Sequence, residues 1–459
     1  MKNFFLISAA LFAIQSYSQE HFSGLNTSNR VGIITAGMNP AELLNMSNKF
    51  ETNILGLSFN VANNKIGFSD ITSDKDIEDL IFVGDEPVNM RIDAEIYGPG
   101  LALKHNKWAF GFYTKANAKL DIVDVDTKLG DAINNSGLSS LLSTTTISND
   151  YNQRINGTTW GEFNLVAGRT LIDNTKHKIN AAVTLKLLFP GSYANLGADQ
   201  FTGTIVQTAG QASLTQTNAI VNFSYSGSLA DSFSNFDDYT KSIFGGLNGF
   251  AGDIGFNYQL KDTKALDNAI DKGKSNKNTY KLNAGFSIRN LGSMTFKDDN
   301  NQSTNYSLVI QGSESLNLNQ FENVDSLQEI ETILLNSGYL TKETSNKDFK
   351  VNLPTTITLY ADLKIIPSLF VSGYLQQKMK DDNDNDQITV QNIFTITPRV
   401  NLGFFEAYVP FSNSEISGFN TGVGFRLGGF YLGSGSILTA LINDSKQADV
   451  YTGFRWAFL

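Results

Sequence analysis

The sequence predicts an all-β protein, a fourteen-stranded antiparallel β-barrel that spans a membrane. Two patterns lead to this prediction. Polar and apolar residues alternate with a period of two over runs of about 10 to 13 residues, the length that a tilted transmembrane strand needs. The gaps between these runs are sorted by length, as the outer loops and periplasmic turns of a bacterial barrel are.

The alternation is clearest between Ile179 and Leu187. Ile179, Val183 and Leu187 share one face, whereas Asn180 and Thr184 share the other, so one face suits lipid and the other suits water. A soluble β-sandwich would also alternate, but with shorter strands and unsorted connections. An even number of runs is what a closed antiparallel barrel requires. The runs cover residues 50–61, 92–104, 107–119, 158–171, 178–190, 249–261, 278–290, 354–366, 369–380, 389–399, 401–411, 417–428, 429–441 and 448–459.

The connections between the runs assign the two sides of the membrane. The first four odd-numbered gaps hold about 30, 38, 58 and 63 residues, whereas the even-numbered gaps are mostly tight turns. The long gaps are therefore predicted to lie outside the cell, and residues 261–277 form the largest predicted periplasmic turn. The last run, with Phe454, Trp456 and Phe458 on one face, resembles the C-terminal signal that the outer-membrane barrel assembly machinery reads during biogenesis.

The composition fits a strand-rich, exported protein. The chain holds 39 glycines, 33 phenylalanines and no cysteine, which excludes disulfide bonds and a lipid-modified N-terminal cysteine. No run of about 20 apolar residues follows the N-terminus, so helical membrane spans are not expected. The net charge of -10 argues against a nucleic-acid partner, which would favour a basic patch.

The N-terminus resembles a signal peptide. A short basic start precedes an apolar run from Phe4 to Ile14 and small residues around Ser16 and Ser18. We therefore expect residues 1–18 to be removed on export, and a buried first helix is the alternative interpretation.

Two of the long gaps contain helical patterns. In residues 325–336, Leu327, Ile330 and Leu334 recur at helical spacing before a glycine, and residues 236–247 hold a second apolar face that includes Ile243 and Phe244. Apolar faces outside the cell must cover the barrel mouth, pair with each other or bind something. These five residues are therefore candidates for capturing a ligand or docking a partner.

Charged residues also fall on the predicted inner face of the barrel. Charges inside a lumen are costly unless they are paired or hydrated, so they indicate either a water-filled pore or a network that holds a plug, to which Arg30 and Glu42 would contribute. We favour the network, because a barrel of this size that holds a folded segment has little room for an open pore. The set is Glu162, Arg169, Lys186, Asp253, Lys281, Arg289, Asp362, Lys364, Glu406, Arg426 and Arg455.

The sequence contains no convincing catalytic or metal-binding set. Its three histidines, His21, His105 and His177, fall near the N-terminus or in predicted turns, where solvated residues are the expected interpretation. The acidic run 381–386 could collect Ca²⁺ through oxygen ligands, but a solvated hairpin tip is the simpler interpretation. We therefore assign no catalytic residue, no metal and no cofactor, and expect no enzymatic activity.

One predicted strand is interrupted in its middle by Gly98, Pro99 and Gly100. Proline cannot donate to a strand ladder and glycine weakens one. The apolar residues also change parity across the triplet, from Ile96 before it to Leu101 after it, which is the phase change that a β-bulge produces. The triplet is either a structural bend or a break that opens the wall sideways.

Several segments resemble the FadL-type outer-membrane barrels, including their PorV branch. Asn39, Pro40 and Ala41 match the "NPA" element before the first strand, "FSIRNLGSM" matches a strand that ends in Asn-Leu-Gly, and "VNLPTTITLYADLKI" matches the entry to a later strand. "FEAYVPFSNSEISGFNTGVGFRLGGFYLG" resembles the closing hairpins of an uncharacterised Bacteroidota group. The resemblance implies an N-terminal hatch, here residues 19–48, inside a barrel formed by residues 49–459 with long extracellular loops that carry short helices.

The resemblance also supplies two functional hypotheses. FadL-type proteins carry hydrophobic molecules across the outer membrane past a hatch and through a lateral opening, which would place Asn39, Pro40 and Ala41 in the hatch and Gly98, Pro99 and Gly100 at the gap. PorV-type relatives instead serve as partners in secretion complexes. We therefore expect a protein in the outer membrane of a Gram-negative bacterium, in contact with its lipid. It would either transport a hydrophobic small molecule passively or serve as an accessory subunit with protein partners.

Overall fold

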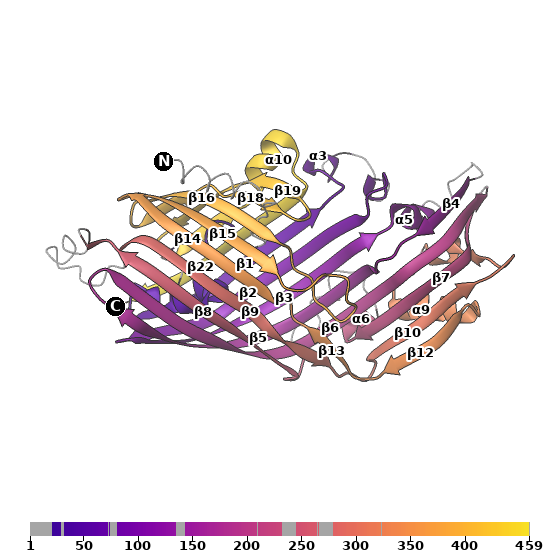
Figure 1. Cartoon of the computed structure of the whole chain (residues 1–459), viewed down its shortest axis with the longest axis horizontal. Coiled ribbons are helices and arrows are strands. Elements are labelled where there is room, and N and C mark those ends of the chain that lie inside the picture. Colours follow the sequence, from indigo (N-terminus) through magenta and orange to yellow (C-terminus); the bar gives the residue numbers. More distant parts are fainter. Residues whose placement is uncertain are drawn as a thin grey trace, which may run out of the picture.

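A closed antiparallel β-barrel forms the main body of the protein (Figure 1). The computed structural model describes residues 21–28, 32–71, 73, 80–134, 143–208, 210–231, 245–263, 265, 279–322 and 324–458. Within these residues the wall has 14 strands, and the last strand pairs with the first, so the sheet closes. The predicted fold class and strand number are confirmed.

Each predicted run corresponds to one position in the wall, although two positions are split into two short strands. Around the barrel the strands are β1 (Phe50–Asn63), β2 (Val88–His105), β3 (Trp108–Val125), β5 (Gln153–Asp173), β6 (His177–Thr208), β8 (Gly249–Lys261), β9 (Tyr280–Phe296), β14 (Thr356–Ile366), β15 (Leu369–Lys378), β16 (Ile393–Asn401), β17 (Phe405–Tyr408) with β18 (Phe411–Ser414), β19 (Gly418–Thr421) with β20 (Val423–Leu427), β21 (Phe430–Ser434) and β22 (Gln447–Phe458).

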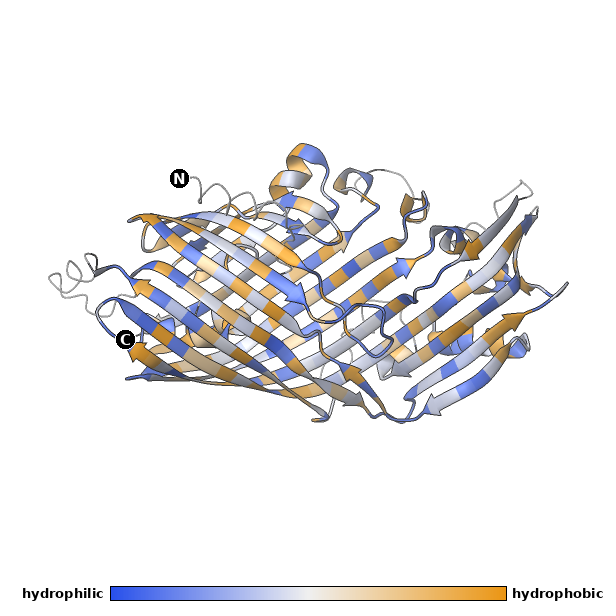
Figure 2. Cartoon of the chain, viewed as in Figure 1, coloured by the Kyte–Doolittle hydropathy of each residue, from blue (hydrophilic) through white to orange (hydrophobic). Residues whose placement is uncertain are grey.

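The two faces of the wall differ in polarity because the strand sequences alternate (Figure 2). On β14, Leu359 and Leu363 are exposed on the outside, whereas Thr358 and Asp362 are fully buried in the lumen. Apolar side chains are exposed in the same way on the other wall strands, and Trp456 stands among them near the chain end. An outward apolar band with aromatic residues near its edge is typical of a barrel in a lipid bilayer.

The wall strands meet at tight turns on the side where β1 starts and β22 ends. Between β2 and β3 the turn is only two residues long, and Asn106 adopts a left-handed conformation with φ of 54°. Positive φ at such a position is typical of the hairpin turns that match strand twist, and asparagine tolerates it well. The even-numbered gaps in the described residues are these turns, and their assignment to the periplasmic side stays a prediction.

The same sheet extends beyond the wall on the opposite side, in a part that we call the wing (Figure 1). It consists of the outer half of β6 with β4 (Ser143–Ser148), β7 (Gln211–Ser226), β10 (Gln302–Ile310), β11 (Leu316–Asn317) and β12 (Leu340–Asn346). β6 has 32 residues and pairs with β5 and β8 in the wall before it pairs with β4 and β7 in the wing. The third long gap is thus largely strand and not loop in its described part, because the alternation of β6 continues well beyond residue 190.

Short helices accompany both parts of the molecule. They are α2 (Gly32–Met38), η1 (Pro40–Asn45), α3 (Phe68–Ile71), α5 (Thr127–Asn134), α6 (Ser228–Asp231), η2 (Leu318–Phe321), α9 (Leu327–Asn336) and α10 (Ile437–Asn443). Among the described residues, no helix is both long and apolar enough to cross a membrane. α9 confirms the helix predicted at 325–336, where Ser326 caps the first turn by accepting a hydrogen bond from the Glu329 amide. Most of the second predicted helix and the whole predicted signal peptide lie outside the described residues.

Several predicted strand boundaries differ from the structure, two of them at segments that leave the wall. The run 429–441 continues past the true end of β21 at Ser434, and its last residues belong to α10. The chain leaves the strand there because the Asp449 carboxylate accepts hydrogen bonds from the Gly435 amide and the Ser436 hydroxyl. The run 389–399 begins too early, because β16 starts at Ile393 and the residues before it fold into the barrel mouth.

Candidate luminal binding site

The N-terminal segment lies inside the barrel, where it packs against inward side chains of the wall. We call the described residues 21–28 and 32–49 the plug. Phe22, Leu25, Ile33 and Leu43 are buried in one cluster with wall residues, among them Tyr97 of β2. Burial of apolar side chains is the main term that holds such a segment in place.

The turn predicted as the hatch element joins α2 to η1 deep in the lumen. Asn39 caps η1, and its side-chain oxygen accepts a hydrogen bond from the Ala41 amide at 3.0 Å. Its side-chain nitrogen donates to the main-chain oxygen of Phe256 on β8 at 2.9 Å. Pro40 fits at the first helical position, and a side chain at Gly255 would collide with Asn39 and Pro40. The three hatch residues are thus brought together against the wall; their role as a moving hatch stays a prediction.

Glu42 ties the plug to the wall through neutral donors. Its carboxylate is buried and accepts hydrogen bonds from Asn257 at 2.8 Å, Asn283 at 2.9 Å and the Tyr360 hydroxyl, and from Asn45 within the plug. A buried carboxylate that keeps its charge without a cation needs several such donors. Glu42 therefore joins the predicted network, whereas Arg30 lies outside the described residues.

Ion pairs complete the network along the inner wall. Arg399 pairs with Asp362 at 2.6 Å, and Arg455 pairs with Glu51 at 2.7 Å, while Glu51 also accepts a hydrogen bond from the Ile33 amide of the plug. The described lumen is therefore crossed by paired charges and by the plug, as the network interpretation predicts. Two members of the predicted inner set lie elsewhere, since Arg169 is exposed over the outer Trp108 ring and Lys281 is exposed while Tyr280 takes the inner position.

The acidic run is part of a segment that crosses the barrel mouth, which we call the strap (residues 379–392). Asp382 pairs with Arg91 of β2 at 3.1 Å, and Arg154 of β5 donates to the main-chain oxygens of Asp382 and Gln387. These strands lie across the lumen from β15 and β16, which the strap connects. Ile388 is fully buried beside wall residues. The solvated-tip interpretation holds for Asp381, Asp384 and Asp386, which are exposed, but not for Asp382, which is buried against Arg91 on the far wall.

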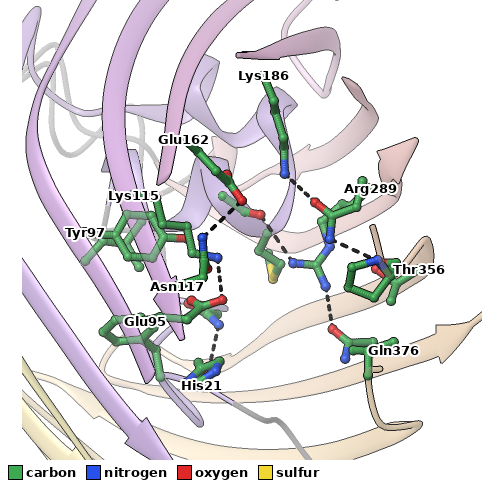
Figure 3. Close-up of a pocket in the computed structure, with 18 of the residues that line it drawn as sticks. His21, Glu95, Tyr97, Lys115, Asn117, Glu162, Lys186, Arg289, Thr356 and Gln376 are labelled. Atoms are coloured by element: carbon green, nitrogen blue, oxygen red, sulfur yellow. Dashed lines mark hydrogen bonds and ion pairs between the residues drawn. The ribbon is translucent and has the colours of Figure 1, made fainter. Parts of the chain in front are cut away.

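A polar chamber of about 80 Å³ lies between the plug and the strap (Figure 3). His21, Phe22 and Met38 of the plug form one side, and Val390 of the strap also contributes. The remaining lining comes from inward side chains of β2, β3, β5, β6, β9, β14 and β15, including Glu95, Tyr97, Lys115, Glu162, Lys186, Arg289 and Gln376. The chamber can hold a small molecule that offers polar groups to these side chains.

His21 reaches the wall and is not a solvated residue. Its Nδ1 lies 2.9 Å from the Ser58 hydroxyl, and its Nε2 lies 3.2 Å from the Asp93 carboxylate, which also binds Lys119. His105 and His177 are exposed at periplasmic turns, as predicted. Sequence reasoning missed His21 because only the folded plug brings it to β1 and β2. Across the described residues, no group of three His, Cys, Asp or Glu side chains could hold a metal ion.

The Gly98-Pro99-Gly100 triplet forms a β-bulge, as the parity change predicts. Opposite β3 the register shifts between Tyr97 and Gly100, and opposite β1 the ladder passes from Asn53–Gly100 directly to Gly56–Tyr97.

Side chains replace the missing ladder at this point. Asn53 donates to the oxygen of Gly98 at 2.8 Å, and the Thr114 hydroxyl donates to the oxygen of Pro99 at 3.2 Å. Tyr97, the residue before the bulge, points into the lumen and packs against Phe22 and Tyr113 with ring centroids 5.6 Å apart. Whether the bulge opens sideways stays a prediction.

The predicted capture residues lie away from the chamber. Leu327 and Leu334 of α9 are 5% and 8% exposed in the apolar core of the wing, and Ile330 packs against the same core. Ile243 and Phe244 lie outside the described residues. Capture on α9 stays a prediction, and it would require the helix to separate from the wing.

Comparison with protein families identifies the family of the chain. A family of unknown function, DUF5723, matches residues 40–435. The chain belongs to this family. In this DUF5723 member the match starts at Pro40 in the plug and ends just after β21, so it includes the strap and most of the chamber lining. No curated protein matches the chain.

Solved structures similar to the chain include hydrocarbon channels. The Pseudomonas putida toluene transporter TodX is 10% identical over 93% of this chain and 94% of that chain, with a TM-score of 0.45. The Ralstonia pickettii toluene transporter TbuX is 12% identical over 98% and 100%, with a TM-score of 0.41. A TodX deltaS2S3 mutant, a monoaromatic hydrocarbon channel, is 11% identical over 97% of each chain, with a TM-score of 0.46. These identities and TM-scores are too low to assign an activity. The relations to the PorV branch and to the Bacteroidota group stay predictions.

Proposed function

We propose that the protein is a passive transporter in the outer membrane of a Gram-negative bacterium, and that it carries a small, mostly hydrophobic molecule. The observation that carries this proposal is the position of the bulge. Tyr97 lines the chamber, and the next two residues, Gly98 and Pro99, interrupt the ladder on the membrane-facing wall. A molecule in the chamber is thus separated from lipid by one side chain and one weakened stretch of wall.

The route would run from the outer face past the strap into the chamber and then sideways at the bulge. The plug closes the direct way to the periplasm, since the hatch turn with Asn39, Pro40 and Ala41 is fully buried against the wall. Lateral exit would require the Tyr97 ring to leave its place between Phe22 and Tyr113. Hydrophobic molecules gain from this route because they pass into lipid without crossing the aqueous periplasm.

A reversible crosslink across the bulge tests the proposal. The chain has no native cysteine, so Ile54→Cys with Pro99→Cys places one pair across the interrupted part of the β1–β2 ladder. Uptake of the hydrophobic dye N-phenyl-1-naphthylamine would be followed in intact cells, whose outer membrane excludes it. We expect oxidation to lower the uptake rate to that of cells with an empty vector, and reduction to restore it.

The matched control is Leu359→Cys with Leu375→Cys, a directly paired position in the intact β14–β15 ladder. Its oxidation should leave uptake unchanged. Uptake by wild-type cells equal to that with an empty vector would contradict transport. A stoichiometric subunit that co-purifies in mild detergent would instead favour the accessory role that the sequence left open.

A further inference from the structure

We infer that the chamber binds a small zwitterion, with its anionic group at Arg289 and its cationic group at Glu162. The inference goes beyond the proposed transport function. A zwitterion is too costly to transfer into lipid, so it would be a second kind of ligand that stays in the chamber, distinct from the hydrophobic molecule that is carried.

Among the residues that the structure describes, Arg289 has no anionic partner. Its guanidinium donates to two neutral oxygens, the side-chain oxygen of Gln376 and the main-chain oxygen of Gly37, the latter at 3.4 Å. Its Nε is buried without a hydrogen-bond partner, and no described carboxylate lies within 4.0 Å of the group. A guanidinium has five donors in a fixed fork that suits a carboxylate, so an anion would complete this site.

Glu162 is the complementary case, a carboxylate that lacks a cationic partner. It is 3% exposed and accepts hydrogen bonds from neutral donors only, Trp160 at 2.9 Å, Asn117 at 3.3 Å and Asn164 at 3.2 Å. The nearest lysines are bound elsewhere, Lys115 to Glu95 and Lys186 to Asp253. No described cation lies within 4.0 Å of Glu162.

The two groups end a row of alternating charges along the inner wall. Glu162, Lys186, Asp253 and Arg289 come from β5, β6, β8 and β9, four neighbouring strands. The inner two members pair with each other at 3.1 Å, which leaves a negative and a positive end. β5 and β9 are three strand spacings apart, about 14 Å along the wall, and both side chains point inward. Figure 3 shows them on opposite sides of the pocket.

One ion cannot neutralise both ends, whereas a molecule with one charge of each sign can. Met38, Pro354 and Val390 add apolar surface to the lining, which suits a short hydrocarbon spacer. The volume of about 80 Å³ is well below the roughly 300–1,000 Å³ of pockets that hold drug-sized ligands, so the bound part of the ligand must be small.

Tryptophan fluorescence can report on the chamber alone. The chain has three tryptophans, and two of them, Trp108 and Trp456, are exposed on the outer wall. In a Trp108→Phe/Trp456→Phe background, Trp160 beside Glu162 is the only one left. The protein would be held in lipid nanodiscs without free detergent and titrated with ω-aminohexanoate, hexanoate and hexylamine, which share one spacer and differ in charge.

We expect ω-aminohexanoate to change Trp160 emission saturably and to bind at least about tenfold more tightly than either singly charged probe, because each buried charged contact contributes separately. Glu162→Gln keeps an oxygen for the Trp160 indole and should lower the affinity for ω-aminohexanoate to that for hexanoate. Arg289→Gln should lower the affinity for ω-aminohexanoate and for hexanoate, and should leave the affinity for hexylamine unchanged.

Arg169→Gln is the matched control, because Arg169 lies on the outer wall over Trp108. This substitution should not change the affinity for any of the three probes. Folding of each variant is checked by the mobility shift of unheated barrels on gels. Equal affinities for the three probes in the unsubstituted chamber would overturn the inference even if a variant failed to fold. Zwitterion binding without dye uptake would contradict the transport proposal and leave the zwitterion site standing. Dye uptake without zwitterion binding would contradict the zwitterion site and leave the transport proposal standing.

Discussion

Glu42 shows how much of the closed lumen depends on single side chains. Its carboxylate collects donors from β8, β9 and β14, so one residue of η1 is fastened to three strands of the wall. Asn39 adds main-chain contacts to the same region. Polar contacts of this kind are buried, so each is costly to leave incomplete.

Glu42→Ala is therefore expected to loosen the plug. The change leaves the donors of Asn283 and Tyr360 without an acceptor, at a cost of about 1–3 kcal/mol for each buried group. Single-channel recordings in planar bilayers should show a higher conductance than wild type, because a loosened plug admits ions. Ser47→Ala, at an exposed plug position, is the control. A conductance equal to that of the control would mean that Glu42 does not hold the lumen closed.

Helix α9 was identified correctly from sequence, whereas the neighbour of its apolar face became visible only in the structure. Its apolar residues meet the wing, and its buried Glu331 accepts hydrogen bonds from the Tyr225 hydroxyl, the Tyr306 hydroxyl and Gln302. The wing lies beyond the membrane-spanning wall. Burial, together with the neighbouring Glu331 carboxylate, raises the pKa of Tyr225 and of Tyr306 above the ordinary value.

This arrangement predicts alkaline release of α9. Because the folded pKa of each phenol exceeds its unfolded value near 10, their contribution to stability is complete below about pH 10 and is lost as the pH rises through the folded values. A dye attached at Leu335→Cys, an exposed α9 position, should report release of the helix above about pH 10. Tyr225→Phe/Tyr306→Phe should abolish that pH dependence. An unchanged alkaline transition in the double variant would contradict this account.

At the scale of the whole molecule, the barrel and the wing share the long strand β6, and the barrel closes through pairs that do not involve the rest of the wing. The wall is complete through pairs that end near Ala198 on β6, where β5 stops contributing partners. Beyond that point β6 pairs with β4 and β7 only, and a separate apolar core forms between the wing and α9. The wing therefore extends the barrel without being part of its closure.

Removing the outer part of the wing should leave the barrel intact. Replacing residues 200–219 with a two-residue Asn-Gly turn joins β6 to β7 at Asp199 and Ile220, which already face each other. We expect the unheated protein to keep its mobility shift on gels, because all 14 wall strands retain their partners. Proteolysis of α9 should become faster, since its core is lost. Loss of the mobility shift would show that closure needs the wing.

The sequence by itself determined the strands of the wall, their number and the end of the barrel at which they meet in tight turns. These properties are local, because the period of an alternation and the length of a gap are visible in the sequence without knowledge of which residues meet in the folded protein. The bulge at Gly98 to Gly100 and helix α9 follow from local patterns in the same way.

Only the tertiary structure decided what fills the lumen. The sequence placed Glu162 and Arg289 on the inner face. It did not show that both lack a counter-ion among the described residues. That result depends on the ion pairs of their neighbours, because Lys115 binds Glu95 and Lys186 binds Asp253. Asp382 of the acidic run and His21 were taken for solvated residues, because Arg91 meets Asp382, and Ser58 and Asp93 meet His21, only when the strap and the plug fold against the wall. A pattern of alternation fixes the face of a side chain, whereas pairing energy depends on the three-dimensional neighbours that closure of the barrel brings together.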